Sequence, residues 1–156
     1  SDRIELSGEA LESARQRLAR LLLLEDADQS LKTMAVNLDE AWSQHLGNLN
    51  RFDEAIEAQQ NVVQYREQTI ERVGRTASAL GDLGFSQATL GVIARKAQNR
   101  ALACSSWESA AATWAEAAGE DELPGYQANM LAGVQRNLEL CRAGRPVSTF
   151  GPLSGG

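Results

Sequence analysis

Apolar residues recur at every third or fourth position along most of this chain, and that spacing is the strongest limit on its fold. Ala, Leu, Glu, Gln and Arg predominate between residues 8 and 142, and all of them favour helices. The recurrence places apolar side chains on one helix face. The prolines Pro124, Pro146 and Pro152 all fall in the last third, and no segment alternates as a strand would. The chain is therefore predicted to be all-α.

Breaks in the apolar pattern divide the chain into about six predicted helices. They cover approximately residues 8–25, 31–49, 52–73, 75–96, 98–118 and 126–141. The fourth contains Gly81, Gly84 and Gly91, each of which costs about 1 kcal/mol relative to alanine in a helix interior. One kinked helix or two short ones would both fit this segment.

The C-terminal sequence RPVSTFGPLSGG, residues 145–156, is rich in Gly, Pro and Ser. This composition is typical of a disordered tail or linker. We expect one helical domain over residues 1–144, followed by a flexible tail or linker over residues 145–156. Because the chain begins at Ser1 and runs quickly into a helix, we interpret it as a module of a larger protein.

Charge and cysteine usage narrow the possible settings of the chain. Fifteen basic and 21 acidic residues give a net charge of -6, which disfavours nucleic acid and anionic lipid as partners. The longest aliphatic run, residues 21–24, is far shorter than the roughly 20 residues of a membrane span. Cys104 and Cys141 lie far apart in helical segments, without metal-ligand spacing. We expect reduced cysteines and a cytoplasmic location, with a single long-range disulfide as the alternative.

Residues 84–118 carry the spacing of a tetratricopeptide repeat. Such a repeat has a large apolar residue and a glycine in its first helix, an alanine about 12 residues later, an aromatic four further on and a second small residue after three more. The small residues lie where two helices touch closely. In this segment the positions are taken in order by Leu90, Gly91, Ala103, Trp107 and Ala110.

A second unit matches this pattern in part. Trp42 takes the large position, Ser43 replaces the glycine, and Gln59 stands where the aromatic is usual. The contact alanines Ala10, Ala55 and Ala103 are separated by 45 and 48 residues, whereas ordinary repeats are about 34 residues long. Residues 8–142 thus resemble a degenerate long-repeat variant, as in cytoskeletal-motor light chains and bacterial regulatory proteins. A plain helical bundle is the alternative.

This resemblance implies antiparallel helix-turn-helix pairs stacked as a short solenoid, with a concave groove that receives a peptide or helix of another protein. The first helix of each pair lines that groove. Asn and Gln side chains there can bind a peptide backbone, and Arg can clamp a carboxylate. Each of these residues could equally belong to an ordinary solvated face. The residues that the resemblance assigns to partner binding are Asn37, Glu40, Gln44, Asn48, Gln87, Arg95 and Lys96.

Catalytic and metal-binding signals are sparse. His45 is the only histidine, and its helical-wheel neighbours Trp42 and Leu49 indicate packing rather than metal ligation. Trp107 and Trp114 are predicted to be buried, with Trp114 the more exposed of the two because it lies nearer the helix end. No glycine-rich phosphate loop, nucleophile elbow, paired cysteine ligand set or His-Glu metal motif is present. We therefore expect no enzymatic activity, no cofactor and no metal.

Three classes of function fit these observations. The leading hypothesis is a protein-interaction module, an adaptor or regulatory scaffold that binds a peptide or helix of another protein. The alternative is a structural or oligomerising bundle, which would make a homo-oligomer. A third class, a sensor of a small ligand or phosphate, would need buried polar groups gathered in one pocket, and the sequence shows no such cluster.

Overall fold

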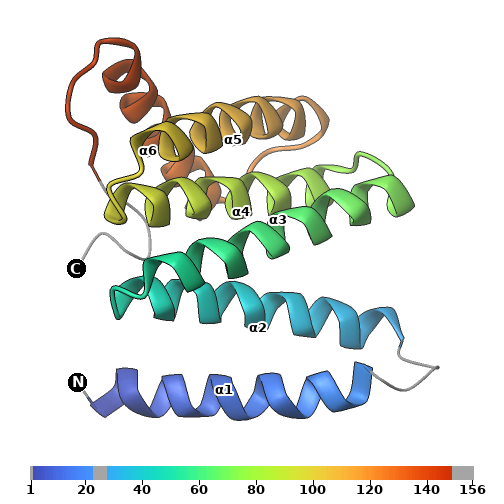
Figure 1. Ribbon diagram of the computed structural model, residues 1–156. Helices are drawn as coiled ribbons and strands as arrows, with labels where there is room; N and C mark the ends of the chain where they lie inside the picture. The colour runs from blue at the N-terminus through green and yellow to red at the C-terminus, as the bar shows by residue number, and fades with distance from the viewer. Residues whose placement is uncertain (1, 23–27, 149–156) are drawn as a thin grey trace.

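The computed structural model describes residues 2–22 and 28–148 and shows six helices in this part of the chain (Figure 1). No strand occurs within these residues, and the all-α prediction is confirmed. The first helix begins earlier than expected, and its predicted end at residues 23–25 lies outside the described residues, as do residues 149–156. The helices are α1 (Asp2–Leu22), α2 (Gln29–Asn48), α3 (Phe52–Val73), α4 (Ala77–Lys96), α5 (Arg100–Glu120) and α6 (Gly125–Arg142).

Each helix packs against the next one along the chain. Figure 1 shows α1 to α5 stacked in order, from blue α1 at the bottom of the view to gold α5 near the top. Second neighbours touch as well, because α4 contacts both α2 and α6. The fourth helix is therefore the centre of the fold, with four other helices against it.

Polar caps and left-handed turn residues set the ends of the central helices. Thr76 accepts a hydrogen bond from the amide of Ala79 at the start of α4 (3.1 Å), and Asn99 accepts one from Leu102 at the start of α5 (3.1 Å). These bonds satisfy amides that lack partners within the helix. Gln98, with φ of 61°, turns the chain between the two helices. Such local signals explain why the connections are short.

Glycines on α4 receive the tryptophans of α5. A Cβ atom added at Gly84 would lie 2.6 Å from Cδ1 and Nε1 of Trp114, and one at Gly91 would collide with Trp107. The glycines therefore do not break the segment: α4 is one continuous helix whose notches admit the indole rings.

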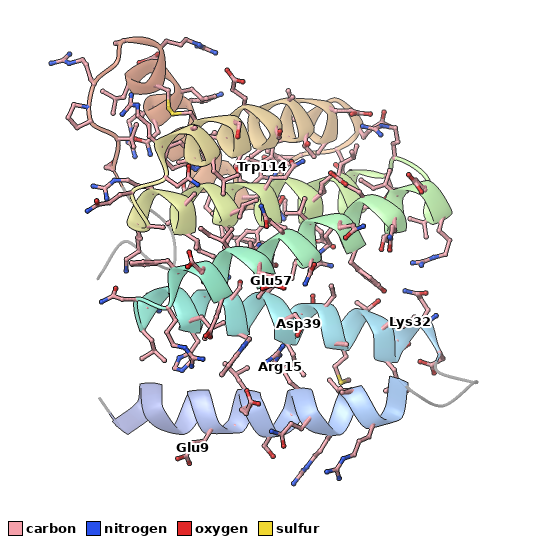
Figure 2. All side chains as sticks on the ribbon, viewed as in Figure 1. Glu9, Arg15, Lys32, Asp39, Glu57 and Trp114 are labelled. Carbon is pink, nitrogen blue, oxygen red and sulfur yellow. A yellow bond between two sulfur atoms is a disulfide. The ribbon has the colours of Figure 1, made fainter. Side chains whose placement is uncertain are left out.

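Both tryptophans are fully buried, with 0% exposure, and Trp114 lies between α4 and α5 in Figure 2. The expectation that Trp114 is the more exposed one is wrong. Its Nε1 donates to the carbonyl oxygen of Gly81 (3.3 Å) and to Oε1 of Gln127 (3.2 Å). The partner from α6 covers the end of α5 that the sequence pattern had left open.

The expectation of reduced cysteines is also wrong. Cys104 on α5 and Cys141 on α6 form a disulfide, and no described cysteine is free. The two residues are 37 positions apart, so local spacing gives no sign of the bond. The hairpin of α5 and α6 brings them together.

Part of the predicted flexible tail is docked on the helices. Val147 is 7% exposed and belongs to the main apolar core. Asn137 and Arg95 bond the backbone of residues 147 and 148. The tail prediction therefore fails for residues 145–148. Its boundary ignored contacts that only the folded helices can supply.

Replacing Gly84 by alanine should destabilise the fold by about 1 to 3 kcal/mol, because the new methyl group would overlap the Trp114 ring. Gly119, a glycine of α5, has no atom within 4 Å of an added Cβ, so Gly119→Ala should be neutral or stabilise by at most about 1 kcal/mol. Urea unfolding of both variants measures the difference. Equal stability of the two would contradict the notch.

Breaking the disulfide should loosen α6 from α5. For a loop of this length, Cys104→Ala with Cys141→Ala should cost about 2 to 4 kcal/mol, mainly by freeing the unfolded chain. Thermal unfolding compares the variant with the oxidised protein. Mass spectrometry under non-reducing conditions should find the two cysteine peptides linked, and two free thiols in the folded protein would refute the bond.

Candidate binding surface

The structure divides the predicted partner-binding residues among three environments. The buried ones cannot line an open groove, and this part of the prediction is wrong. Gln87 faces α5, where its Oε1 accepts a hydrogen bond from Oγ1 of Thr113 (2.8 Å). Asn37 and Asn48 are exposed, Gln44, Arg95 and Lys96 are half-buried, and Glu40 and Gln87 are buried.

Glu40 is the centre of a buried polar network that joins α2, α3 and α4. Its Oε2 accepts hydrogen bonds from Oγ of Ser86 (2.5 Å) and Nε2 of Gln59 (2.9 Å). Gln59 also donates to the carbonyl oxygen of Ser86 (2.9 Å), and its Oε1 accepts from Ser43. Buried polar groups are tolerated when they satisfy one another. The network therefore sets the register of three helices.

Arg66 extends this network toward the surface. Its Nη2 donates to Oδ1 of Asn37 (2.9 Å) and lies 3.6 Å from Oε1 of Glu40, while Nη1 lies 3.8 Å from Oδ2 of Asp82. The guanidinium is largely buried, and its Nε has no hydrogen-bond partner among the described residues. One cation thus lies near two carboxylates and holds exposed Asn37 in place.

A hollow of about 280 Å³ lies between the N-terminal parts of α4 and α6. Asp82, Asp121 and Glu122 give it an acidic lining, and Tyr126 and Gln127 are among its other lining residues. The Tyr126 side is open to solvent, with 58% of the residue exposed. Its hydroxyl accepts a hydrogen bond from Nε2 of Gln127 (3.1 Å). The hollow thus combines an accessible aromatic ring with negative charge.

The Tyr126 ring is oriented by its neighbour on α4. Its centroid lies 5.9 Å from that of Phe85, with the ring planes inclined by 72°. This edge-on contact is a favourable geometry for aromatic pairs. A ring held in this way loses little further conformational freedom when a ligand binds over it.

Asp82 is electrostatically the most perturbed group at this hollow. Burial raises the pKa of its carboxyl group above the ordinary value, and the positive charge of Arg66 offsets part of the rise. Such a group costs folding free energy when it is ionised. A carboxyl group that is partly buried in a hollow and has a perturbed pKa is a candidate for a functional role.

A second hollow, also of about 280 Å³, lies at the C-terminal end of α4. Its lining includes Arg95, Gln98 and Arg100, together with residues 146 and 147. Arg100 donates to the carbonyl oxygen of Leu140 (3.1 Å). Within the described ranges, neither arginine is paired with a carboxylate. The two ends of α4 thus lie beside hollows of opposite charge.

Tyr126 and Asn137 were not predicted from the sequence as site residues. Tyr126 was assigned only to the start of the last helix, although an exposed aromatic is common at binding surfaces. Asn137 is 1% exposed and interrupts the apolar face that contains Val134 and Leu138. A polar residue on an apolar face was the available signal for Asn137.

His45 packs as the sequence analysis expected. It is half-buried, and its ring centroid lies 5.6 Å from that of Trp42. Figure 2 shows Arg15 and Asp39 where α1 meets α2, and there Arg15 Nε bonds Oδ1 of Asp39 (2.8 Å). Among the side chains that the structure describes, those of residues 8–20 and 28–148, no group of three or more His, Cys, Asp or Glu residues is placed to hold a metal ion.

Comparison of the chain with protein-family models, with curated proteins and with solved structures finds no match. No helix in the described part of the chain is sufficiently long and apolar to span a membrane. Inferences about function therefore rest on the residues and their geometry.

Replacing Asp82 by asparagine should raise stability at pH 7. The pKa of Asp82 is higher in the folded than in the unfolded chain, so stability is lost as pH rises and the folded carboxyl group ionises. Below the unfolded pKa the wild type and Asp82→Asn should unfold at similar temperatures. Thermal unfolding from pH 3 to pH 8, with exposed Asp121→Asn as control, measures the difference in unfolding temperature between wild type and Asp82→Asn. A difference that does not become smaller in acid would contradict a raised pKa of Asp82.

Proposed function

We propose that this chain is a protein-interaction module, an adaptor or regulatory scaffold that binds a peptide or helix of another protein. The observation that carries the proposal is the hollow between α4 and α6, where exposed Tyr126 adjoins Asp82 and Glu122. Tyrosine is enriched at interaction hot spots because it offers a large apolar ring with a polar end. A solvent-exposed hollow of this kind suits recognition of a side chain.

The order of the helices supports a solenoid of the tetratricopeptide kind. In that family the first helix of each pair lines the concave side. Pairing α2 with α3 and α4 with α5 makes α2, α4 and α6 the lining helices, in agreement with the contacts of α4 to α2 and α6. On this assignment Asn37, Gln44 and Asn48 extend the same surface on α2, while Arg95 and Lys96 lie at its other end on α4.

The charges of the surface indicate the chemistry of the partner. A lysine or arginine side chain would enter the hollow at Asp82 and lie against the ring of Tyr126, where charge attraction and a cation-π contact add. Arg95 and Arg100 favour an acidic residue toward the other end of α4. Thirteen positions separate Asp82 from Arg95, which is roughly 20 Å along a helix. A partner segment with basic and acidic ends would therefore bind in one direction.

A catalytic role is not part of the proposal. Glu40 and Ser43 on α2, Gln59 on α3 and Ser86 on α4 bond one another, so they act on the fold rather than on a substrate. We propose that binding involves no cofactor, nucleic acid or membrane. The net charge of -6 disfavours nucleic acid, and no described helix is long and apolar enough to span a membrane. A cytoplasmic location stays a prediction, and the disulfide counts against it because such bonds persist mainly in oxidising compartments.

A structural or oligomerising role is the second candidate. A hollow of about 550 Å³ where α1 meets the C-terminal part of α2 is lined by Trp42, His45 and Leu49, among others. Leu49 is 49% exposed, and exposed apolar groups of this kind can join two copies of a chain. Sedimentation of the wild type over a range of concentrations separates this role from partner binding.

The proposed partner surface can be tested with peptides selected from a random display library on the full chain. Selected peptides should be enriched in Lys or Arg, and Tyr126→Ala should weaken their binding at least about fivefold, which is roughly 1 kcal/mol. Tyr65→Ala on α3 is the matched control and should bind normally. Peptides that bind Tyr126→Ala as tightly as wild type, or a stable dimer with no selected peptides, would contradict the proposal.

A further inference from the structure

Residues 146–148 lie in a site whose side chains bind main-chain atoms. Asn137 Nδ2 donates to the carbonyl oxygen of Ser148 (2.7 Å), and the Ser148 amide donates back to Oδ1 of Asn137 (3.0 Å). Arg95 Nε donates to the carbonyl oxygen of Val147 (2.9 Å). Three main-chain groups of the segment are thus bound by two side chains. Contacts of this kind accept many sequences, because every residue other than proline carries the same groups.

With residues 147 and 148 docked, the side-chain amide of Asn137 is buried, and Ser148 supplies its hydrogen-bond partners. Asn137 is 1% exposed and lies on the face of α6 that packs against the apolar core. Burying an amide without hydrogen-bond partners is unfavourable, and an apolar residue would fill the position more cheaply. Its donors and its acceptor are directed at the segment. Asn137 is therefore a built recognition group.

The helices themselves depend little on this segment. Backbone bonds from Gly144 to Cys141 (3.2 Å) and from Arg145 to Leu140 (2.9 Å) already close α6. The segment adds one buried side chain, Val147, to a core otherwise built from the helices. The segment thus follows a helix hairpin whose last turn is closed without it.

The hollow beside the segment indicates what its own residues leave unmatched. Arg95 and Arg100 line it, and neither is paired with a carboxylate in the described structure. The residue that leads into the site, Arg145, is itself basic. The amide of residue 145 and the guanidinium of Arg100 both donate to the carbonyl oxygen of Leu140. An acidic residue at position 145 would therefore start beside the guanidinium of Arg100, a group that binds carboxylates well. The chain's own segment therefore matches the backbone contacts and the apolar position but not the charge.

We propose that Asn137, Arg95 and Arg100 form a peptide site that residues 146–148 fill in cis, and that a partner segment with an acidic residue two positions before a small aliphatic residue displaces them. This rests on the proposed function as an interaction module and names one of its ligands. The tethered segment competes at an effective concentration in the millimolar range. Only a better-matched partner opens the site, so the segment acts as an internal inhibitor.

The test uses full chains and fluorescent peptides with the sequence of residues 144–149. Val147→Asp and the milder Val147→Thr both weaken the segment in cis. Anisotropy should show the peptide binding to Val147→Asp at least tenfold more tightly than to wild type, with Val147→Thr between them. An Arg145→Glu peptide should bind several-fold more tightly still, and 0.5 M NaCl should remove that gain by screening. A peptide carrying Val147→Asp should not bind.

Controls separate the outcomes. Asn137→Ala added to Val147→Asp should abolish peptide binding, whereas Tyr126→Ala should leave it unchanged, so this site and the acidic hollow fail independently. Unfolding of both Val147 variants would show that the fold cannot form without the docked segment and would overturn the proposal. Val147 variants that fold but do not bind the peptide would also overturn the proposal. A wild-type dimer abolished by Val147→Asp would assign the site to a second copy of the chain instead.

Discussion

The close approach of α4 to α5 is the contact on which the rest of the structure depends. It exists because Gly84 and Gly91 leave room for Trp114 and Trp107, which no residue with a Cβ atom could do at that distance. Once α5 is placed, the disulfide and the bond from Trp114 to Gln127 position α6 against the same central helix. The acidic hollow between α4 and α6 is a consequence of that packing, and so is the basic hollow between the C-terminal end of α4 and residues 146 and 147.

Polar side chains then do what apolar packing alone could not. The network around Glu40 holds α2 and α3 on the opposite side of α4, and Arg66 links it to Asp82 at the edge of the acidic hollow. The same principle recurs at Asn137, which is satisfied by a segment rather than by a neighbouring helix. At Glu40 the buried polar groups hold three helices together. At Asn137 they define the site that we propose another segment can occupy.

The helices were predictable because their signals are local: apolar spacing, caps and small residues opposite large ones. The contact between the helices of Gly91 and Trp107 followed from the same spacing. What escaped prediction depends on partners distant in the sequence. Glu40 is buried because Gln59 and Ser86, on two other helices, bond its carboxylate. Residues 145–148 have a composition typical of linkers, yet they dock on the helices because Asn137 and Arg95 bond their backbone. The site was only partly predictable for the same reason: Arg95 was named from its helix, but its role became visible only with Val147 in place.

The most direct measurement is the nuclear magnetic resonance signal of the Asn137 side-chain amide in the full chain. We predict slow exchange of its protons with solvent and a nuclear Overhauser effect to the chain's own residue 148. An excess of the Arg145→Glu form of the 144–149 peptide should replace that effect by one to residue 148 of the peptide. The exposed amide of Asn61 is the reference for fast exchange. Two results would contradict the proposed site. One is exchange of the Asn137 amide as fast as that of Asn61. The other is a contact between Asn137 and the chain's own residue 148 that persists at saturating peptide.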